Sequence, residues 1–550
     1  MNTQTTERER RDATEDEIKT LPHVVDSIPL IVWIALVAGA LERFTYYAVT
    51  APWRVLGLGQ ATATNISNAF SFFSFIAPLP FAILSDARIG RYKTLCISYI
   101  LNTCGCVVLF VTSLPAVTQV SIKIFGLALA MVLLGLGTGG IKATVSPFIG
   151  DQYTVLTPQL VVTKKGERVI VDRTLTLQYI YNVFYWYGAP RSKHMELADM
   201  ERFTNIGSLS LIASTYLEKE VGFWAAYLLP LCFVWIPIPL LLVWQRSFVN
   251  LAPDGNVLPQ AGRVLVYSVR GRFRLDAAKP RFQAEKYGRT VPWDNLFVLE
   301  IKRGLKACKV MACFVPFYLC MNQITNNFVS QAGQMKLGVI PNDTIQALNP
   351  IACVLLGPVI QQLLYPGLQK FGVAFGSISR MTWSFIAISS SMAYAAGLQK
   401  LIYTRGPCYE SPRNCPDSNG GKIPNNLSVW VQTPSYFLLA FAEILGFTTL
   451  SEYSYSEAPK DMRSLVQALR QVTAAIGSAL GMALSPVAVD PKVMYLYTGL
   501  AATMIAAAPA FWAAFGSYDK IDDEDDLNEV GLMQPNTHDG MEETAARAHP

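Results

Sequence analysis

The chain has 550 residues, of which 51% are hydrophobic and only 15% are charged, and its formal net charge is +5. This composition excludes an ordinary soluble enzyme and is typical of a protein that crosses a membrane many times. The positive charge does not indicate nucleic-acid binding, because the basic residues cluster in short segments between apolar stretches.

Apolar stretches long enough to cross a bilayer recur along the whole chain. Only helices and closed barrels satisfy backbone polar groups in lipid, and these stretches are too long and too apolar for barrel strands. We therefore predict an all-α polytopic membrane protein, a bundle of about twelve transmembrane helices in two six-helix halves. In chain order the predicted spans are 27–49, 66–85, 94–116, 123–148, 177–213 (interrupted), 221–245, 308–330, 345–366, 378–397, 432–451, 464–488 and 493–515.

The spans divide the chain into regions with different surroundings. Two bundles that face each other around a site at the membrane midplane form the usual plan of alternating access. Basic clusters follow the second and fourth spans and precede the seventh, which places them all in the cytoplasm if the N-terminus is cytoplasmic. The predicted regions are a cytoplasmic N-terminal tail (1–26), an N-terminal six-helix bundle (27–245), a cytoplasmic linker (246–305), a C-terminal six-helix bundle (306–516) and an acidic, disordered cytoplasmic tail (517–550).

The first predicted span carries two opposite charges side by side. Glu42 and Arg43 lie inside it and are followed by Tyr46 and Tyr47. A charge at the centre of a spanning helix costs roughly 2.5–3.5 kcal/mol on insertion scales, and such residues usually face a wet, protein-lined path for ions or substrate. The alternative is that the pair fastens this helix to a neighbour.

Carboxylates and cations at membrane depth are the groups that proton coupling requires, because burial raises a carboxyl pKa while a nearby cation lowers it. Glu42, Arg43 and Lys142 supply such a set on two helices of the first bundle, and Glu443 adds an acid in the second. None of the four histidines lies within an intact predicted span, so the coupling group must be a carboxylate. For Lys142 and Glu443 the alternative is a structural ion pair.

The loop before the tenth span is predicted to lie outside. It contains Cys408 and Cys415, which a disulfide could join there, and the glycosylation sequon Asn426-Leu427-Ser428. The other eight cysteines lie in or beside spans and are interpreted as small apolar side chains. We found no metal-ligand cluster, nucleophile motif or nucleotide-binding loop, so we expect no metal, no cofactor and no enzymatic activity.

The loop after the second span contains Asp86, Gly90, Arg91 and Lys93. It resembles the short cytoplasmic loop signature of the major facilitator superfamily. Physically it is a tight turn whose charges can latch neighbouring helix ends in one conformation.

A finer resemblance, from about residue 27 to 515, is to the proton-dependent oligopeptide transporter family, and within it to fungal peptide transporters. Its motifs here are Glu42-Arg43-Phe44-Thr45-Tyr46-Tyr47, then Gly137, Gly140 and Lys142 with Asp151-Gln152-Tyr153, then Phe184-Tyr185-Trp186 with Asn205-Ile206-Gly207-Ser208, then Asn349-Pro350, and finally Glu443 with Glu452 to Lys460. The resemblance implies proton-driven symport of di- and tripeptides by a plasma-membrane monomer with both termini in the cytoplasm.

The resemblance also implies roles for residues. Glu443 would meet the peptide amino terminus, with Asn205 and Asn349 hydrogen-bonding near it. Lys142 and Arg43 would lie toward the peptide carboxylate. Tyr46 and Tyr47 would line the cavity, and the alternative for these tyrosines is simple packing. The partners are then a small peptide, a proton and the lipid bilayer, and no nucleic acid.

The sequence departs from the family pattern at two titratable positions. Gly39 stands where the family has the leading glutamate of the first helix, and Asn322 where bacterial members have a seventh-helix glutamate. The alternatives are therefore the same fold moving another small polar solute or secondary metabolite with weak or no proton coupling, or a non-transporting nutrient sensor.

The predicted fifth span is interrupted by the charged segment Tyr187–Arg202, which hydrocarbon would not accept. Without it, Trp186 would join Phe203 in one apolar helix that resembles the family's fifth-helix signature. We favour a retained intron translated in frame, because codons for Trp186-Tyr187-Gly188 and Arg202 permit splice donor and acceptor sequences. The alternative is a true insertion that loops out and splits the helix.

Overall fold

The structure is a computed structural model of the chain. The residues that it describes are 10–52, 60–155, 157–162, 168–172, 176, 180, 207, 209–250, 257–272, 274–371, 375–412, 415–419, 422–456 and 463–519. Tyr187–Arg202, Asn205 and the acidic part of the C-terminal tail lie outside these residues.

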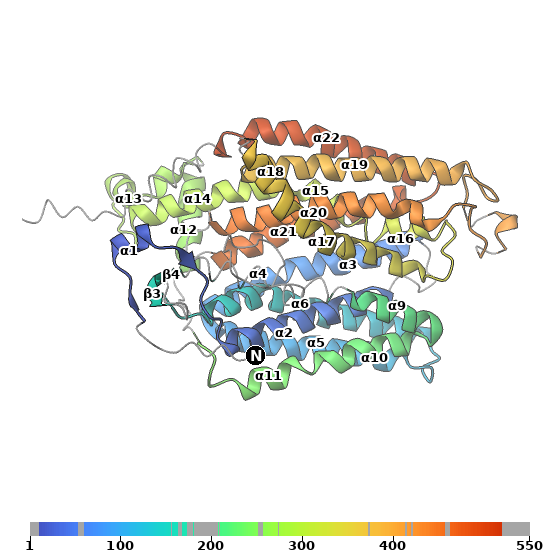
Figure 1. Ribbon diagram of the computed structural model, residues 1–550, viewed down its shortest axis with the longest axis horizontal. Helices are drawn as coiled ribbons and strands as arrows, with labels where there is room; N and C mark the ends of the chain where they lie inside the picture. Colours follow the sequence, from blue (N-terminus) through green and yellow to red (C-terminus); the bar gives the residue numbers. More distant parts are fainter. Residues whose placement is uncertain are drawn as a thin grey trace, which may run out of the picture.

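Two helical bundles lie side by side along the long axis of the molecule (Figure 1). The first bundle contains α2 (Leu30–Thr50), α3 (Gln60–Ile76), α4 (Pro78–Leu84), α5 (Arg91–Ser113), α6 (Val120–Asp151), α9 (Ser210–Glu220), α10 (Phe223–Val234) and α11 (Pro237–Val243). The second contains α14 (Asn295–Ala312), α15 (Val315–Met321), α16 (Asn327–Ala332), η4 (Asn342–Ala347), α17 (Leu348–Val359), α18 (Tyr365–Lys370), α19 (Ser377–Tyr403), α20 (Thr433–Ser456), α21 (Arg463–Ala483) and α22 (Val493–Phe515). Colours follow the sequence in the figure, and one bundle is blue to green while the other is yellow-green to red. Each bundle is therefore formed by one half of the chain.

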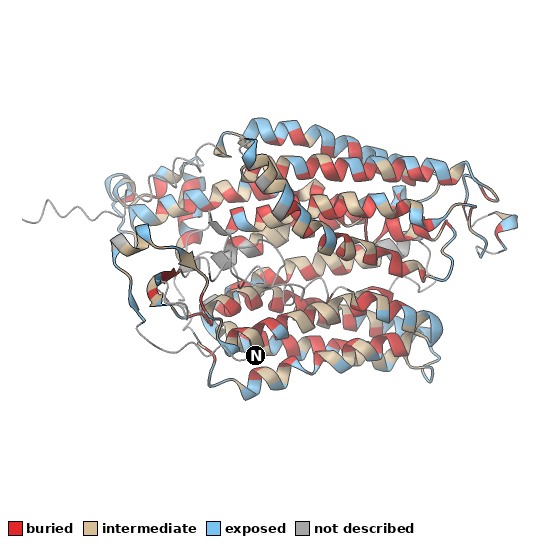
Figure 2. Cartoon of the chain, in the orientation of Figure 1, coloured by how far each residue is buried: buried red, intermediate tan, exposed pale blue. Residues whose placement is uncertain are grey.

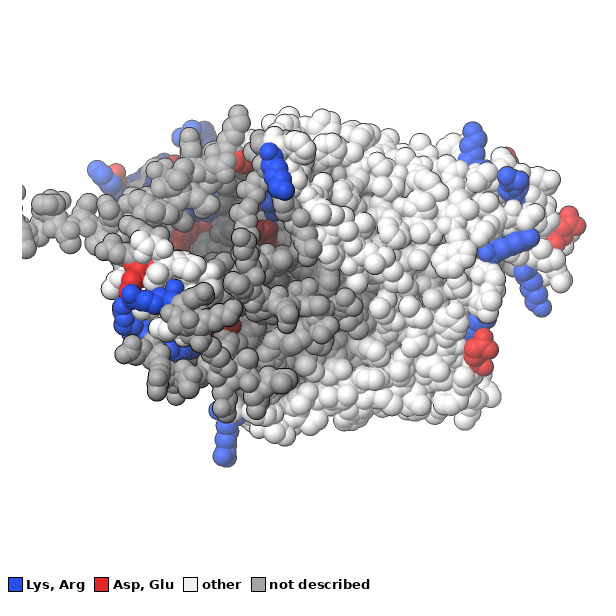
Figure 3. All heavy atoms as spheres, in the orientation of Figure 1, with Lys and Arg blue, Asp and Glu red and all other residues white. Residues whose placement is uncertain are grey.

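The outer surface of the bundles suits a membrane. Seven helical segments among the described residues are long and apolar enough to cross a membrane, or eight if the bent pair α14 and α15 counts as one. Figure 3 shows Lys, Arg, Asp and Glu gathered toward the two ends of the visible face, with a broad uncharged band between them. Many apolar side chains on the bundles are exposed, and buried residues line the packed faces between helices (Figure 2).

Some of the predicted spans form helices that are not among these segments long and apolar enough to cross a membrane. The span predicted at 378–397 lies in α19, which packs between α20 and α22 and carries buried serines. Ser389 donates to the Ala501 carbonyl at 2.7 Å, and Ser391 donates to the Ser435 carbonyl at 2.9 Å. Polar side chains that bond neighbouring helices lower the hydropathy of a helix that protein surrounds. The prediction of a helical, multi-span membrane protein is confirmed.

Proline and glycine set the breaks between helices. Pro78 begins α4 after the turn at Ala77, so the second predicted span is divided into α3 and α4. A short π-helix, Ser85–Ile89, follows α4, and Gly90 begins α5 with a φ of +86° that favours glycine.

The segment predicted as a linker (246–305) contains helices. It contains α12 (Val257–Arg270), a 3-10 turn at Leu275–Ala278 and α13 (Pro280–Tyr287). A cluster of buried residues that includes Ala261, Val264 and Trp293 packs α12 against the start of α14. The linker therefore forms a small folded layer at one end of the bundles (Figure 1).

A small sheet, absent from the sequence-based prediction, lies near the same end of the molecule. Its strands are β1 (Arg11–Asp12), β2 (His23–Val24), β3 (Gln159–Val162) and β4 (Arg168–Val171), in the order β1-β3-β4-β2. β1 pairs antiparallel with β3, and β2 pairs parallel with β4. The segment around α1 (Glu15–Thr20) is thereby docked on the connection that follows α6.

The start of the tail predicted as disordered (517–550) is ordered. The carboxylate of Asp519 accepts hydrogen bonds from the backbone N–H groups of Ile378 (2.7 Å) and Ser379 (2.9 Å). These are donors of the first turn of α19 that no helical carbonyl can satisfy. The prediction was wrong for these first residues, because the capping carboxylate lies far from α19 in sequence.

Candidate functional site

Glu42 and Arg43 form an ion pair with each other on α2. The Arg43 Nε donates to Glu42 Oε2 at 2.6 Å, and the Glu42 side chain is 2% exposed. Within the described residues the other carboxylate oxygen, Glu42 Oε1, has no hydrogen-bond partner. The described contacts therefore give no ion pair that fastens α2 to a neighbouring helix through these charges. They leave a buried carboxylate that is half satisfied.

Lys142 extends from α6 toward aromatic rings. Its Nζ lies 3.2 Å from Ser74 Oγ, 4.4 Å from the Phe75 ring centroid and 5.1 Å from the Tyr46 ring centroid. Arg43 lies over the same Tyr46 ring at 5.3 Å. Tyr46 therefore lies close to two cations, at distances where the face of an aromatic ring attracts positive charge.

Glu443 lies on α20 in the second bundle. Its Oε2 accepts a hydrogen bond from Asn349 Nδ2 of α17 at 2.8 Å, and Cys353 Sγ lies 3.7 Å away. The alternative that Glu443 and Lys142 form a structural ion pair has no support, since no such contact occurs among the described residues. The predicted pair Asn349 and Glu443 is thus brought together, while Lys142 stays in the other bundle.

Arg470 is a functional candidate that the sequence reasoning missed. It belongs to α21, which packs against α3, α4 and α6 of the first bundle and against α15 of the second. A charged residue inside the predicted span 464–488 was the signal that could have identified it. Its position places a third cation at the boundary between the bundles.

Tyr47 belongs to the contact between the bundles. It stacks edge to face with Tyr46 at 5.4 Å between centroids, and it packs against a cluster of Ala51, Leu211 and Ala347. These come from α2, α9 and η4 and therefore from both bundles. Beside them, Thr215 Oγ1 and Thr344 Oγ1 share a hydrogen bond of 2.6 Å. The packing alternative for Tyr47 therefore has support.

The end of the fifth predicted span packs against the charged turn of α2. A Cβ on Gly207 would lie 3.1 Å from the backbone N of Phe44 and 3.3 Å from the Ala40 carbonyl. Ser210 Oγ donates to the Phe44 carbonyl at 2.7 Å. Asn205 itself lies outside the described residues, so its predicted role remains a proposal.

The predicted latch residues lie where α4, α5 and α6 meet. Arg91 Nη1 lies 2.7 Å from each of the two carboxylate oxygens of Asp151, which joins the first turn of α5 to the last residue of α6. Gly90 forms the tight turn before α5, and Lys93 is exposed. The side chain of Asp86 lies outside the described residues. The turn therefore links two helix ends through Arg91 and Asp151. Asp151 belongs to the family motif Asp151-Gln152-Tyr153 and not to the predicted latch.

The loop between α19 and α20 contains the predicted disulfide pair. Cys408 and Cys415 are joined, with their Cα atoms 5.5 Å apart. The loop lies at the end of the molecule opposite the small sheet (Figure 1). Among the described residues no group of His, Cys, Asp and Glu could hold a metal ion.

The arrangement is that of a membrane carrier. Two bundles lie side by side, each has charged side chains at membrane depth, and a helical linker lies at one end. A family model described as the POT family matches residues 92–505. The chain belongs to this family and is a transporter, not an enzyme.

Among its relatives, the peptide transporter PTR_A of Candidozyma auris is 38% identical over 96% of this chain and 88% of its own. The probable peptide transporter ptr2 of Schizosaccharomyces pombe is 37% identical over 93% of this chain and 82% of its own. The peptide transporter imqD of Aspergillus flavus is 54% identical, but over 51% of this chain and 70% of its own.

Solved structures share the fold. The POT family transporter PepTSo superimposes with a TM-score of 0.68 and 19% identity, covering 90% of this chain and 99% of that one. A POT family transporter in complex with a thioalcohol-conjugated peptide gives a TM-score of 0.62 and 16% identity, covering 89% of this chain and 97% of that one.

Proposed function

We propose that this protein is a proton-coupled symporter of di- and tripeptides that works by alternating access. The observation that carries the proposal is how charge is divided between the bundles at membrane depth. Arg43 and Lys142 lie in the first bundle, and the carboxylate of Glu443 lies in the second. A short peptide is a zwitterion, so its carboxylate suits the two cations and its amino group suits Glu443. Relatives that match most of the chain are named peptide transporters.

The proton would act at the half-satisfied carboxylate of Glu42. While ionised, Glu42 holds Arg43 through the 2.6 Å contact. Protonation removes that charge, which leaves Arg43 free to pair with a peptide carboxylate. Proton binding and substrate binding would then favour each other. Gly39 removes one titratable group from this helix, so coupling rests on Glu42.

Tyr46 would serve as a shared platform for the two cations. Both charges lie within cation–π distance of its ring. Such a platform keeps like charges near one another without an anion between them, which leaves their outward faces available to a carboxylate. The site for side chains of the peptide must be roomy and adaptable, because one carrier accepts many sequences.

The finer assignments are also proposals. The protein would act as a monomer in the plasma membrane with both termini in the cytoplasm, and the region boundaries predicted above would apply. The disulfide between Cys408 and Cys415 supports an outer position for the α19–α20 loop, because disulfides persist in oxidising surroundings.

Competition for uptake tests the substrate class. The protein is expressed in yeast that lacks its own peptide uptake, and labelled dipeptide uptake is measured with an excess of unlabelled competitors. We expect saturable uptake that di- and tripeptides inhibit and that free amino acids and pentapeptides leave unchanged. Absence of saturable uptake by protein shown at the cell surface would favour a different solute or a sensor.

A further inference from the structure

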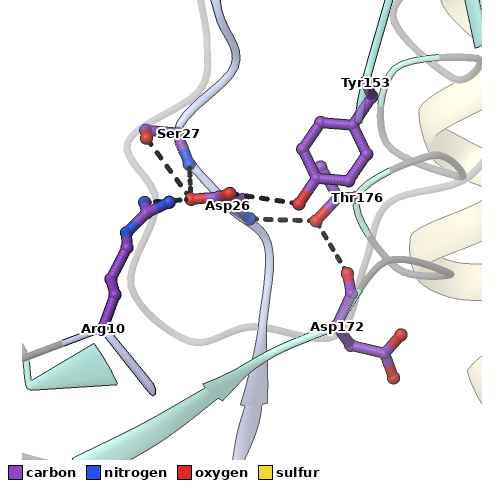
Figure 4. A network of polar contacts seen from close by, with 6 residues as sticks. All are labelled: Arg10, Asp26, Ser27, Tyr153, Asp172 and Thr176. Carbon is purple, nitrogen blue, oxygen red and sulfur yellow. Dashed lines mark hydrogen bonds and ion pairs between the residues drawn. The ribbon is translucent and has the colours of Figure 1, made fainter. Parts of the chain in front are cut away.

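The docked N-terminal segment is held by charged and hydrogen-bonded contacts on two of its residues, Asp26 and His23. The Asp26 carboxylate accepts from Arg10 at 2.7 Å, from the Ser27 backbone N–H at 2.7 Å and from Tyr153 Oη at 3.1 Å (Figure 4). Its own backbone N–H donates to Thr176 Oγ1 at 3.0 Å. Tyr153 is 2% exposed and follows α6 directly, so these contacts reach the end of a membrane helix.

His23 has an acceptor at each ring nitrogen. Its Nδ1 lies 2.9 Å from Asp172 Oδ2 at the end of β4, and its Nε2 lies 2.8 Å from the Ile18 carbonyl in α1. A neutral imidazole has one N–H and can donate to only one of the two, whereas an imidazolium donates to both. The geometry therefore fits the protonated ring, and a neutral ring would set an unprotonated nitrogen against an oxygen lone pair.

The surroundings favour the same state. Asp172 faces the ring from the position after β4. Among the other described charged side chains of the docked segment, Glu17 pairs with Arg11 and Arg168, Asp26 pairs with Arg10, and the exposed Asp12 accepts from Thr157 Oγ1 at 2.8 Å. The Ile18 carbonyl, and after it the Asp172 carboxylate, raise the pKa of His23 above its ordinary value near 6.5. The ring is 30% exposed, so protons reach it from solvent.

We infer that His23 is a cytoplasmic proton-binding site that clamps the N-terminal segment onto the connection between α6 and the fifth span. The inference rests on the proposed function for its physiological sense, because symport delivers protons to the cytoplasm. Acidification then strengthens the clamp, and the clamp restrains the connection that follows α6. The helix α6 itself packs against α21 of the second bundle. The device is a feedback brake on proton-coupled import.

The sign of the pH dependence follows from linkage. The docked state has the higher pKa, so its extra stability is fully present below the ordinary histidine pKa. It is lost as the cytoplasmic pH rises through the raised pKa. Between these two values each change in pH alters the fraction of docked chains, and this window includes the near-neutral range.

Amide hydrogen exchange on the purified full-length protein tests the clamp directly. The N–H of Ile170 donates to the Pro22 carbonyl, and the N–H of Asp172 donates to the Val24 carbonyl, so both are protected only while the segment is docked. After correction for intrinsic exchange, we expect their protection to fall by about tenfold between acid and alkaline pH, the effect of losing one charge-assisted hydrogen bond. His23→Gln and Asp172→Asn should show the low protection at every pH.

Asp417→Asn is the matched control, since it removes the same charge from an exposed residue of the α19–α20 loop. It should exchange as the parent protein does. Protection of the two amides that is independent of pH and unchanged in His23→Gln would overturn the inference. This readout needs no transport, so it distinguishes failure of the clamp from failure of the proposed function.

Uptake measurements then test the consequence. Cells are loaded with a permeant weak acid at fixed external pH, which lowers cytoplasmic pH. We expect dipeptide uptake to fall more in the parent than in His23→Gln, beyond the loss of driving force that both share. Equal inhibition of the two proteins would refute the brake even if the clamp exists.

Discussion

At the scale of single residues, the charged side chains at membrane depth have contacts that a substrate or a proton could replace. Glu42 binds its own neighbour Arg43, Lys142 lies over aromatic rings, and Glu443 accepts from a neutral amide. A buried charge without a full partner is costly and is usually retained for function. Each of these groups has capacity for a further partner, and a zwitterionic peptide supplies both signs.

Replacing Glu443 tests the amino-terminal half of the site. Glu443→Gln keeps the shape but removes the charge that would bind an ammonium group. We expect dipeptide uptake to fall roughly ten- to a hundredfold, as for the loss of one charged hydrogen bond, with unchanged amounts at the cell surface.

Glu452→Gln on the same helix is the control for this substitution. Glu452 is 59% exposed and lies 3.8 Å from Arg380, so the change should leave uptake close to that of the parent. Equal uptake by Glu443→Gln and the parent would remove Glu443 from the site.

Sequence reasoning reached these residues unevenly, for physical reasons. Glu42, Arg43 and Lys142 are conspicuous because charge is rare in apolar stretches. That Arg43 and Lys142 share the Tyr46 ring was not predictable, because it depends on how α2, α3 and α6 pack. Asp151 was noticed only as part of a motif, and its bond to Arg91 joins residues 60 positions apart.

At the scale of elements, small residues allow α5 and α6 to approach closely. A Cβ on Gly137 would lie 2.7 Å from the backbone N of Asn102 and 2.8 Å from the Ser98 carbonyl. Both are backbone atoms, so no side chain can move aside to make room. The glycines of α6 therefore have a packing reason, and the sequence could show their presence but not the partner helix.

Gly137→Ala should consequently destabilise the first bundle. Overpacking of this kind costs about 1–3 kcal/mol. We expect a lower apparent Tm in detergent, measured by intrinsic fluorescence. Gly262→Ala is the control, because a Cβ there meets nothing within 4 Å and alanine is the better helix former. A Tm for Gly137→Ala equal to or above that of Gly262→Ala would contradict the close approach.

The small sheet illustrates what local patterns miss. β1 and β2 contain two residues each, and they pair with strands roughly 150 residues away. Such short strands carry no periodic signal, and their pairing becomes visible only when the end of α6 is placed. The segment 246–305 was predicted only as a cytoplasmic linker, and the apolar residues of its helices pack on the start of α14.

At the scale of the whole molecule, composition and apolar periodicity predicted most of the architecture. The structure has two helical bundles, with α12 and α13 between them in sequence, and a disulfide joins Cys408 and Cys415 in the α19–α20 loop. The predicted region boundaries stay predictions. Family motifs then predicted the fold. The solved transporters have this fold, although their sequences are less than 20% identical to this chain. The hydrogen bond between Thr215 and Thr344 was not predictable, because it joins residues of different bundles.

The segment Tyr187–Arg202 bears on whether the protein as translated can work at all. Its neighbour Gly207 packs against the charged turn of α2, so an interruption there would disturb the proposed site. We propose that the segment is absent from the active protein. Transcripts that retain its codons in most mature messages would contradict this.

Dipeptide uptake at acid and neutral external pH, by the chain with and without Tyr187–Arg202, tests the central claim most directly. Yeast without endogenous peptide uptake supplies the background, and surface labelling confirms that both forms arrive. We predict saturable uptake that is stronger at acid pH and strongest in the shortened form. Uptake that is equal at both pH values would contradict proton coupling, and no uptake by either form at the surface would contradict peptide transport.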